Sequence, residues 1–237
     1  MQKLLIMLCL IASLVSGAWA ISIYDVQFTT NPGSDGTFPS RYVGKSVSLE
    51  GIVTATNYRN GGYFISEALN GAWRGILVLD RNARVKQGDR IFVSGTVSET
   101  FGMTCLQDIS QTRVLESSSF LPRPIILTTG QLSSADEAEA YEGVYVKLMN
   151  ATAFGTRAIK NKVNVTDGTG TCVVQSGSFG DRDTVKAASG TYSSISGIVL
   201  YSYSEFTLSP INATDVVMNQ PTSVQSRSWG RIKSIYK

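Results

Sequence analysis

Apolar and polar residues alternate in short runs along most of this chain, and glycine-containing turns separate the runs. Such alternation is typical of β-strands that bury one face. Only 133–141, which has a serine start and an acidic first turn, predicts a helix. The pattern therefore predicts an all-β protein. The predicted strands cover 45–56, 63–65, 75–79, 91–97 and 104–106 in the first half, and 144–153, 162–166, 171–175, 195–201 and 205–208 in the second.

The two halves also repeat one another about 100 residues apart. The repeated positions are Tyr42, Gly44, Val47 and Leu49, which recur as Tyr141, Gly143, Val146 and Leu148, and Ser94-Gly95, which recurs as Ser196-Gly197. Five short strands per copy, with a polar connection between the third and fourth, predict a small closed Greek-key barrel of the OB-fold type. A seven-stranded sandwich is the alternative, but each copy supplies about two strands too few. We therefore expect two tandem OB-fold-like barrels, at 21–121 and 122–218.

Residues 1–20 predict a signal peptide. Lys3 gives a positive start, 4–15 is apolar, and Ala18-Trp19-Ala20 fits a small-x-small cleavage site. The apolar run is too short to favour a permanent membrane span. We therefore expect a secreted mature chain that begins at Ile21 and has no transmembrane segment.

Residues 219–237 break the strand pattern. A polar linker containing Pro221 leads to Trp229, Ile232 and Tyr236, which would share one face of a helix. So short a helix is unstable alone. The segment is therefore a candidate for binding a sorting or surface partner, for anchoring on a membrane surface, or for a frayed end.

Cys105 and Cys172 remain after removal of 1–20, one in each copy. An exported protein meets oxidising conditions, so the two cysteines form either a single bridge between the copies or two buried thiols on strands. In neither case does a cysteine framework hold the protein together. Stability has to come from apolar cores.

Histidine is absent, which removes most acid–base and metal chemistry from consideration. Ser-His-Asp and Cys-His catalysis are excluded, together with nearly all catalytic zinc sites. Asp181, Arg182 and Asp183 form a candidate calcium loop, but the acids lack the glycine and spacing of such loops, and a solvated loop is the alternative. We therefore predict that the protein is not an enzyme and has no cofactor or metal.

Four segments of the first copy, YVGKSVSLEGIVTAT, GYFISE, GILVLD and VKQGDRIFVSGTVSETFGMTCL, resemble the OB-fold accessory domains of large extracellular bacterial nucleases. The tandem form, with PIILTTGQL and AEAYEGVYVKL opening the second copy, is similar to secreted bacterial OB-domain proteins. The resemblance covers 21–218 and implies a binding module, because those nucleases keep their chemistry in a separate domain that this chain lacks. One group of OB-fold nucleases, those resembling staphylococcal nuclease, works without a histidine base. These enzymes carry an arginine, an aspartate and a glutamate at a fixed spacing along the chain. Arg84 and Asp89 match the first two, but Phe92 stands at the third position.

OB barrels bind ligands on the outer face of strands two and three and on the neighbouring loops. Bases stack on flat aromatic rings while guanidinium groups bind phosphates, so aromatic and basic residues in this region predict binding of single-stranded DNA or RNA. Burial of Tyr63 and Trp73 as core is the alternative. The predicted ligand-binding residues of the first copy are Tyr58, Arg59, Tyr63, Trp73 and Arg74, with Phe101 in the loop after strand four.

The formal net charge of +3 does not indicate a generally basic surface. The positive excess comes from basic residues near the two ends of the chain, so the part between them carries no net positive charge. Any anion binding there has to depend on a local group of basic side chains. Two other hypotheses remain: the same aromatic surface could bind a polysaccharide of the cell envelope, or the protein could be a structural surface protein that binds neither ligand. A salt titration separates nucleic-acid binding from polysaccharide binding, because phosphate binding weakens steeply with salt and neutral sugar binding does not. The basic residues in question are Lys3, Arg227, Arg231, Lys233 and Lys237.

Overall fold

The structure is a computed structural model, and it describes residues 21–34, 36–59, 61–118, 120–159, 161–180 and 190–219, apart from the side chains of 156–159. The predicted signal peptide (1–20), the candidate calcium loop at 181–183 and the tail from 220 onward lie outside the described residues. No helix among those described is long and apolar enough to cross a membrane.

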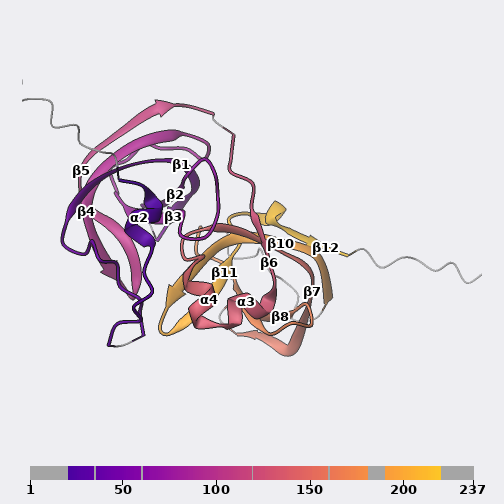
Figure 1. Ribbon diagram of the computed structural model, residues 1–237. Helices are drawn as coiled ribbons and strands as arrows, with labels where there is room; N and C mark the ends of the chain where they lie inside the picture. The colour runs from indigo at the N-terminus through magenta and orange to yellow at the C-terminus, as the bar shows by residue number, and fades with distance from the viewer. Residues whose placement is uncertain are drawn as a thin grey trace, which may run out of the picture.

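The first copy folds into a closed barrel in the order β1-β2-β3-β5-β4 (Figure 1). β3 and β5 are parallel, and the remaining neighbours are antiparallel. This order and this single parallel pair are those of an OB-fold barrel, so the predicted five-stranded barrel is confirmed. Its strands are β1 (Ser46–Tyr58), β2 (Gly62–Ser66), β3 (Gly75–Leu79), β4 (Arg90–Thr100) and β5 (Met103–Glu116), and the helix α2 (Ile23–Gln27) precedes them.

The second copy repeats this topology with β7, β8, β9, β11 and β10, and the pairing of β10 with β7 closes the barrel. Two short strands, β6 and β12, extend the sheet beside β7 and β10. The chain is thus a tandem of two mixed five-stranded barrels. The elements are β6 (Ile125–Leu127), β7 (Tyr145–Ile159), β8 (Lys162–Thr166), β9 (Cys172–Gln175), β10 (Gly190–Ser202), β11 (Glu205–Ser209), the 3-10 helix η1 (Ala213–Asp215) and β12 (Val216–Met218).

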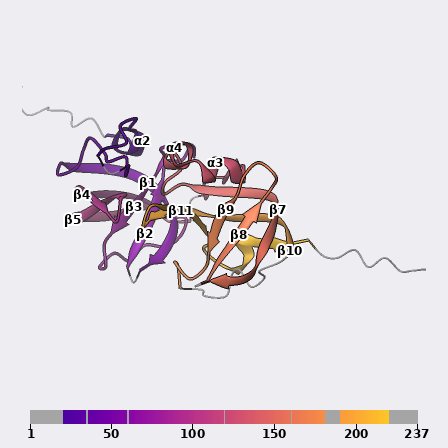
Figure 2. The same cartoon turned by 90° about the horizontal axis from the view of Figure 1, so that it is seen from below.

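The helix predicted at 133–141 is two short helices, α3 (Thr129–Ser133) and α4 (Ala135–Glu139). The first begins earlier than predicted because Thr128 and Gln131 form a capping box. It ends at Ser134, whose extended backbone (φ −90°, ψ 117°) breaks the helix before α4 starts. Figure 2 shows α2, α4 and α3 along one side of the two barrels.

Alternating residues of each strand fill the barrel interiors. In β4, for example, Ile91, Val93 and Val97 are buried, and Phe92, Ser94 and Thr96 are more exposed. Each large apolar side chain removed from water contributes about 1.5–3 kcal/mol. Each copy therefore has a core of its own, which explains why the two copies share apolar residues at the positions that form these cores.

A third apolar cluster lies between the barrels. Phe64 of β2 and Leu77 of β3 point away from the first core, yet they are at most 1 % exposed. Ile198 and Leu200 of β10, together with Phe179, cover them from the second barrel. The outer face of β2 and β3 is therefore buried against the second barrel.

Two glycines bring the barrel backbones into direct contact. A Cβ at Gly75 in β3 would lie 2.2 Å from the carbonyl oxygen of Gly143, and a Cβ at Gly143 would lie 3.0 Å from that of Gly75. Real Cβ atoms do not approach other atoms as closely as 2.2 Å. Only glycine at position 75 permits this packing of the barrels.

The two cysteines are free buried thiols that lie in different clusters. Cys105 belongs to the cluster between the barrels and Cys172 to the core of the second barrel. Of the two alternatives, the structure therefore has separate thiols and no bridge between the copies.

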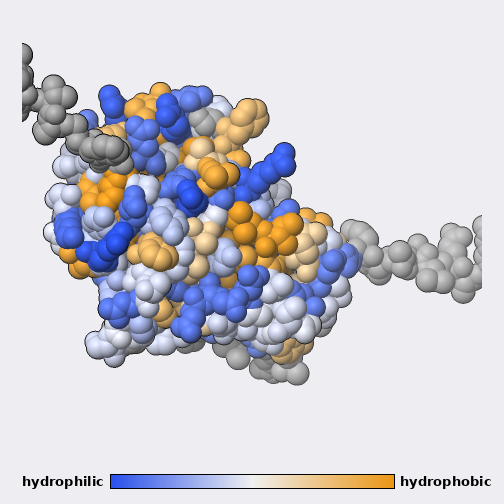
Figure 3. All heavy atoms as spheres, viewed as in Figure 1, coloured by the Kyte–Doolittle hydropathy of each residue, from blue (hydrophilic) through white to orange (hydrophobic). Residues whose placement is uncertain are grey.

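Part of the exposed surface is apolar. Figure 3 shows hydrophobic side chains gathered over the sheet formed by β6, β7, β10 and β12. The exposed large apolar residues on these strands are Ile126, Met149, Phe154, Val217 and Met218.

Candidate functional site

Two of the predicted ligand-binding residues are buried. Tyr63 is 2 % exposed in the core of the first barrel, and Tyr58 is 3 % exposed in the cluster between the barrels. Burial raises the pKa of the Tyr63 phenol to about 12. The expectation that both rings lie on the binding surface is wrong, because the second barrel covers the strand face on which Tyr58 lies and Tyr63 points inward.

Trp73 is half-buried at the contact between α2 and the second barrel. Its backbone N–H donates to the carbonyl oxygen of Ala140. Its ring packs edge-on against Phe28, with centroids 5.6 Å apart. Trp73 therefore has a structural role, in agreement with the packing alternative.

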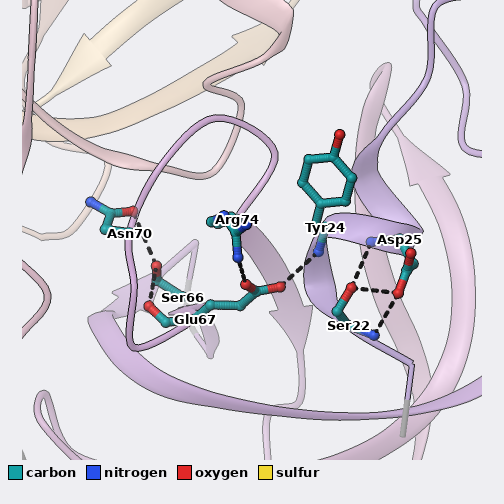
Figure 4. Close-up of polar contacts among 7 residues, drawn as sticks. All are labelled: Ser22, Tyr24, Asp25, Ser66, Glu67, Asn70 and Arg74. Atoms are coloured by element: carbon teal, nitrogen blue, oxygen red, sulfur yellow. Dashed lines mark hydrogen bonds and ion pairs between the residues drawn. The ribbon is translucent and has the colours of Figure 1, made fainter. Parts of the chain in front are cut away.

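Arg74 is held by neighbours within the first barrel and α2 (Figure 4). Its guanidinium forms an ion pair with Glu67 and lies over the Tyr24 ring, 5.4 Å from the centroid. The other carboxylate oxygen of Glu67 accepts a hydrogen bond of 2.9 Å from the Tyr24 N–H. These contacts fix α2 to the β2–β3 connection, so the charge of Arg74 is already neutralised.

The remaining two predicted residues, Arg59 and Phe101, meet at the surface. Arg59 lies in the β1–β2 turn, and its guanidinium carbon is 5.4 Å from the centroid of Phe101 in the β4–β5 turn. Phe101 is 59 % exposed, and its ring lies 6.1 Å from that of Tyr203, which is 84 % exposed. We call Arg59, Phe101 and Tyr203 the loop cluster.

Tyr203 was missed as a site residue, although the repeat contains the signal that locates it. It occupies the same place in the β10–β11 turn as Phe101 does in the β4–β5 turn. All three residues of the loop cluster have positive φ angles, of 42°, 56° and 53°. Such angles are uncommon outside glycine and concentrate at functional sites.

A basic hollow lies beside the loop cluster. Its volume is about 490 Å³, and the β1–β2 turn, the β3–β4 connection and the segment at 179–180 form its walls. Arg81 and Arg84 line it, and the stem of Arg81 packs against Gly61, where a Cβ would lie 2.9 Å from the Arg81 Cγ. Arg59 does not line the hollow itself, but it lies in the same β1–β2 turn as Asn57 and Gly61, which do.

The positive charges of this hollow are not neutralised within the described part of the chain, where none of the ion pairs involves Arg59, Arg81 or Arg84. Asp80, which precedes Arg81 in the chain, accepts a hydrogen bond of 2.8 Å from the Thr112 hydroxyl and one of 3.0 Å from the Asn82 N–H. The arginines are therefore available to an anion.

The second copy has a weaker candidate binding surface than the first. Lys162 forms an ion pair with Glu205, Phe154 is 43 % exposed, and the side chains of Arg157 and Lys160 lie outside the described set. Across the described ranges, no three His, Cys, Asp or Glu side chains are placed to hold a metal ion. Burial raises the pKa of the Cys105 thiol to about 11 and that of Cys172 to about 12, so both stay protonated at neutral pH.

No protein-family model matches the chain, and no curated protein matches it. Among solved structures it is similar to the Ifi202 HINa domain in complex with a 20-base-pair double-stranded DNA, at 12 % identity over 69 % of this chain and 93 % of that one, with a TM-score of 0.36. It is also similar to the p204 HINb domain, at 11 % identity over 68 % and 91 %, with a TM-score of 0.35. Likenesses this distant do not indicate what this chain binds.

Proposed function

We propose that the protein is an exported, non-catalytic module that binds single-stranded nucleic acid across the loop cluster and the basic hollow. One observation carries the proposal: two adjacent exposed rings, Phe101 and Tyr203, lie beside a guanidinium group that has no carboxylate partner among the described residues. Stacking on an aromatic ring is worth about 1–3 kcal/mol per base and tolerates any base.

The proposal gives a role to each part of the surface. Phe101 and Tyr203 provide stacking platforms, and Arg59, which lies over the Phe101 ring, comes from the β1–β2 turn that also lines the hollow. Arg81 and Arg84 then bind the phosphates that follow the stacked bases. With three arginines engaged, the logarithm of affinity should fall with the logarithm of salt concentration with a slope of about −2.

This surface replaces the outer face of β2 and β3 as the proposed binding face. Phe64 and Leu77 on that face contact the second barrel. The loops, in contrast, belong to both barrels and are open to solvent. A ligand on them touches both copies at once, which gives the tandem arrangement a use in binding.

Fluorescence anisotropy with short labelled DNA and RNA single strands tests the proposal. The double variant Phe101→Ala with Tyr203→Ala should weaken binding by at least about tenfold, since two stacking contacts are lost. Phe120→Ala is the matched control, because Phe120 is an aromatic residue 96 % exposed outside the loop cluster.

Two results would overturn the proposal. One is the absence of any anisotropy change at low salt, and the other is a double variant that binds as tightly as the wild type. Binding of a neutral polysaccharide with no salt dependence would favour the competing carbohydrate hypothesis, because sugars stack on the same rings without phosphate contacts.

A further inference from the structure

A carboxyl group is buried at the centre of the contact between the barrels. Glu142, which follows α4, is 2 % exposed. Its Oε1 accepts a hydrogen bond of 2.9 Å from the backbone N–H of Thr104 in β5 of the first barrel. Its Oε2 has no hydrogen-bond partner among the described residues. A glutamate that links two barrels in this way cannot be hydrated as an ion.

Among the described residues, the charged groups that act on Glu142 are two other acids. Glu139 of α4 is 4 % exposed, and Glu99 at the end of β4 accepts a hydrogen bond of 2.9 Å from the Thr104 hydroxyl. Tyr58 of β1 and Cys105 of β5 also lie within electrostatic range of Glu142. The guanidinium group of Arg59 lies over the ring of Tyr58, 5.3 Å from its centroid.

Burial and mutual repulsion have a direct consequence for protonation. Burial, with the charge of Glu99 adding to it, raises the pKa of Glu139 from its ordinary 4.5 to about 8. Burial, followed by the charges of Glu139 and Glu99, raises the pKa of Glu142 well above 4.5. An unpaired buried carboxylate is costly, so the closed contact holds these protons.

We propose that the contact between the barrels is a proton-dependent closure over the outer face of β2 and β3. With Glu139 and Glu142 protonated, the barrels pack together. Loss of these protons separates them and exposes Phe64 and Leu77. The uncovered face is the one that OB barrels ordinarily use for ligands.

The direction of the pH dependence follows from the higher proton affinity of the closed form. Closure is complete below about pH 4.5, where the acids are protonated in both forms, and it weakens as pH rises towards about 8. Phe101 and Tyr203 belong to different barrels, so opening also separates the two rings of the loop cluster.

Thiol labelling of the full chain tests the closure independently of any nucleic acid. Cys105 is 0 % exposed between the barrels, and Cys172 is 3 % exposed within the second core, which makes Cys172 an internal control. Labelling rates at pH values of about 5 and about 9, each divided by that of a free thiol, are read by mass spectrometry. The rate at Cys105 should rise at least about tenfold more than the rate at Cys172.

The variants Glu142→Gln and Glu139→Gln, alone and together, keep the shape of the protonated acid without its titration. They should keep Cys105 protected at the higher pH, with unchanged circular dichroism. Equal protection of wild-type Cys105 at both pH values would overturn the proposal, and so would variants that open as the wild type does. Should the variants misfold, small-angle scattering of the wild type decides: the radius of gyration has to increase with pH.

Discussion

The substitution Gly75→Ala probes the barrel contact at its tightest point. The new Cβ would lie 2.2 Å from the oxygen and 2.5 Å from the carbon of the Gly143 carbonyl. Ordinary contact begins at 3.4 Å, so the barrels have to move apart by more than an ångström. Both partners are backbone atoms, and no rotamer change relieves the overlap.

The magnitude follows from what that movement breaks. Among the described residues, four hydrogen bonds join the two copies, from the Trp73 N–H to Ala140, from the Thr104 N–H to Glu142, and from the Asn70 amide to Tyr145 and to Arg123. Each contributes about 0.5–1.5 kcal/mol net, so their loss costs about 2–6 kcal/mol. Loosened packing in the cluster between the barrels adds to this. We expect the free energy of unfolding to fall by about 3 kcal/mol or more.

Urea denaturation followed by circular dichroism measures the change. Gly44 and Gly143 supply a matched pair of variants, since they are repeat-equivalent and have φ angles of +80° and +72°. Alanine at either position costs about 1–2 kcal/mol for the left-handed backbone. Nothing lies within 4 Å of a Cβ at Gly44, whereas Gly143 faces the first barrel. Gly143→Ala should therefore destabilise more than Gly44→Ala. Equal losses for that pair, or a Gly75→Ala variant within about 0.5 kcal/mol of the wild type, would refute the reasoning.

Two further predictions concern residues outside the loop cluster. Trp73→Ala should lower the free energy of unfolding by about 1–2 kcal/mol, because a half-buried ring is lost. It should leave the affinity for oligonucleotides unchanged. A variant that is as stable as the wild type but no longer binds would show that Trp73 is a binding residue. Hydrogen bonds from Thr129 and Thr169 hold the pKa of Asp167 well below its usual range, against the opposing effect of burial. Its contribution to stability is therefore present above pH 3.8 and is lost as pH falls further. Asp167→Asn should flatten the acid limb of a plot of melting temperature against pH, and an acid limb equal to that of the wild type would contradict this.

The strands were predictable because their signal is local. Alternation in 91–97 and the turn glycines place β4 to within three residues, but the strand predicted at 104–106 was too short, because β5 continues to Glu116. Of the helix predicted at 133–141, the part that is α4 was right and α3 was missed, because the start of α3 depends on the capping box of Thr128 and its end on the backbone of Ser134. Neither feature changes the apolar pattern of the sequence.

The site was harder to predict because the barrel contact decides which residues are exposed. β2 and β3 carry almost uninterrupted apolar runs, which is typical of strands buried on both faces. No local pattern identifies the covering partner, and so Tyr58 was expected at the surface. Phe101 and Arg59 were found because turn residues stay exposed in either arrangement. Tyr203 could have been predicted as the repeat equivalent of Phe101, but only by comparing the turns of the two copies as well as their strands.

The barrels meet through faces that are not equivalent in the repeat, β2 and β3 of the first against β10 of the second. In a head-to-tail contact each unit leaves one face free, and identical units joined in this way add one after another into rings or filaments. In this chain polar residues replace part of the apolar contact on each free face. Asn164, which is exposed, stands where the first copy has Phe64. Thr96 and Ser98 stand where the second has Ile198 and Leu200. The divergence of the two copies therefore removes apolar side chains that a third barrel would need in order to pack on in the same way.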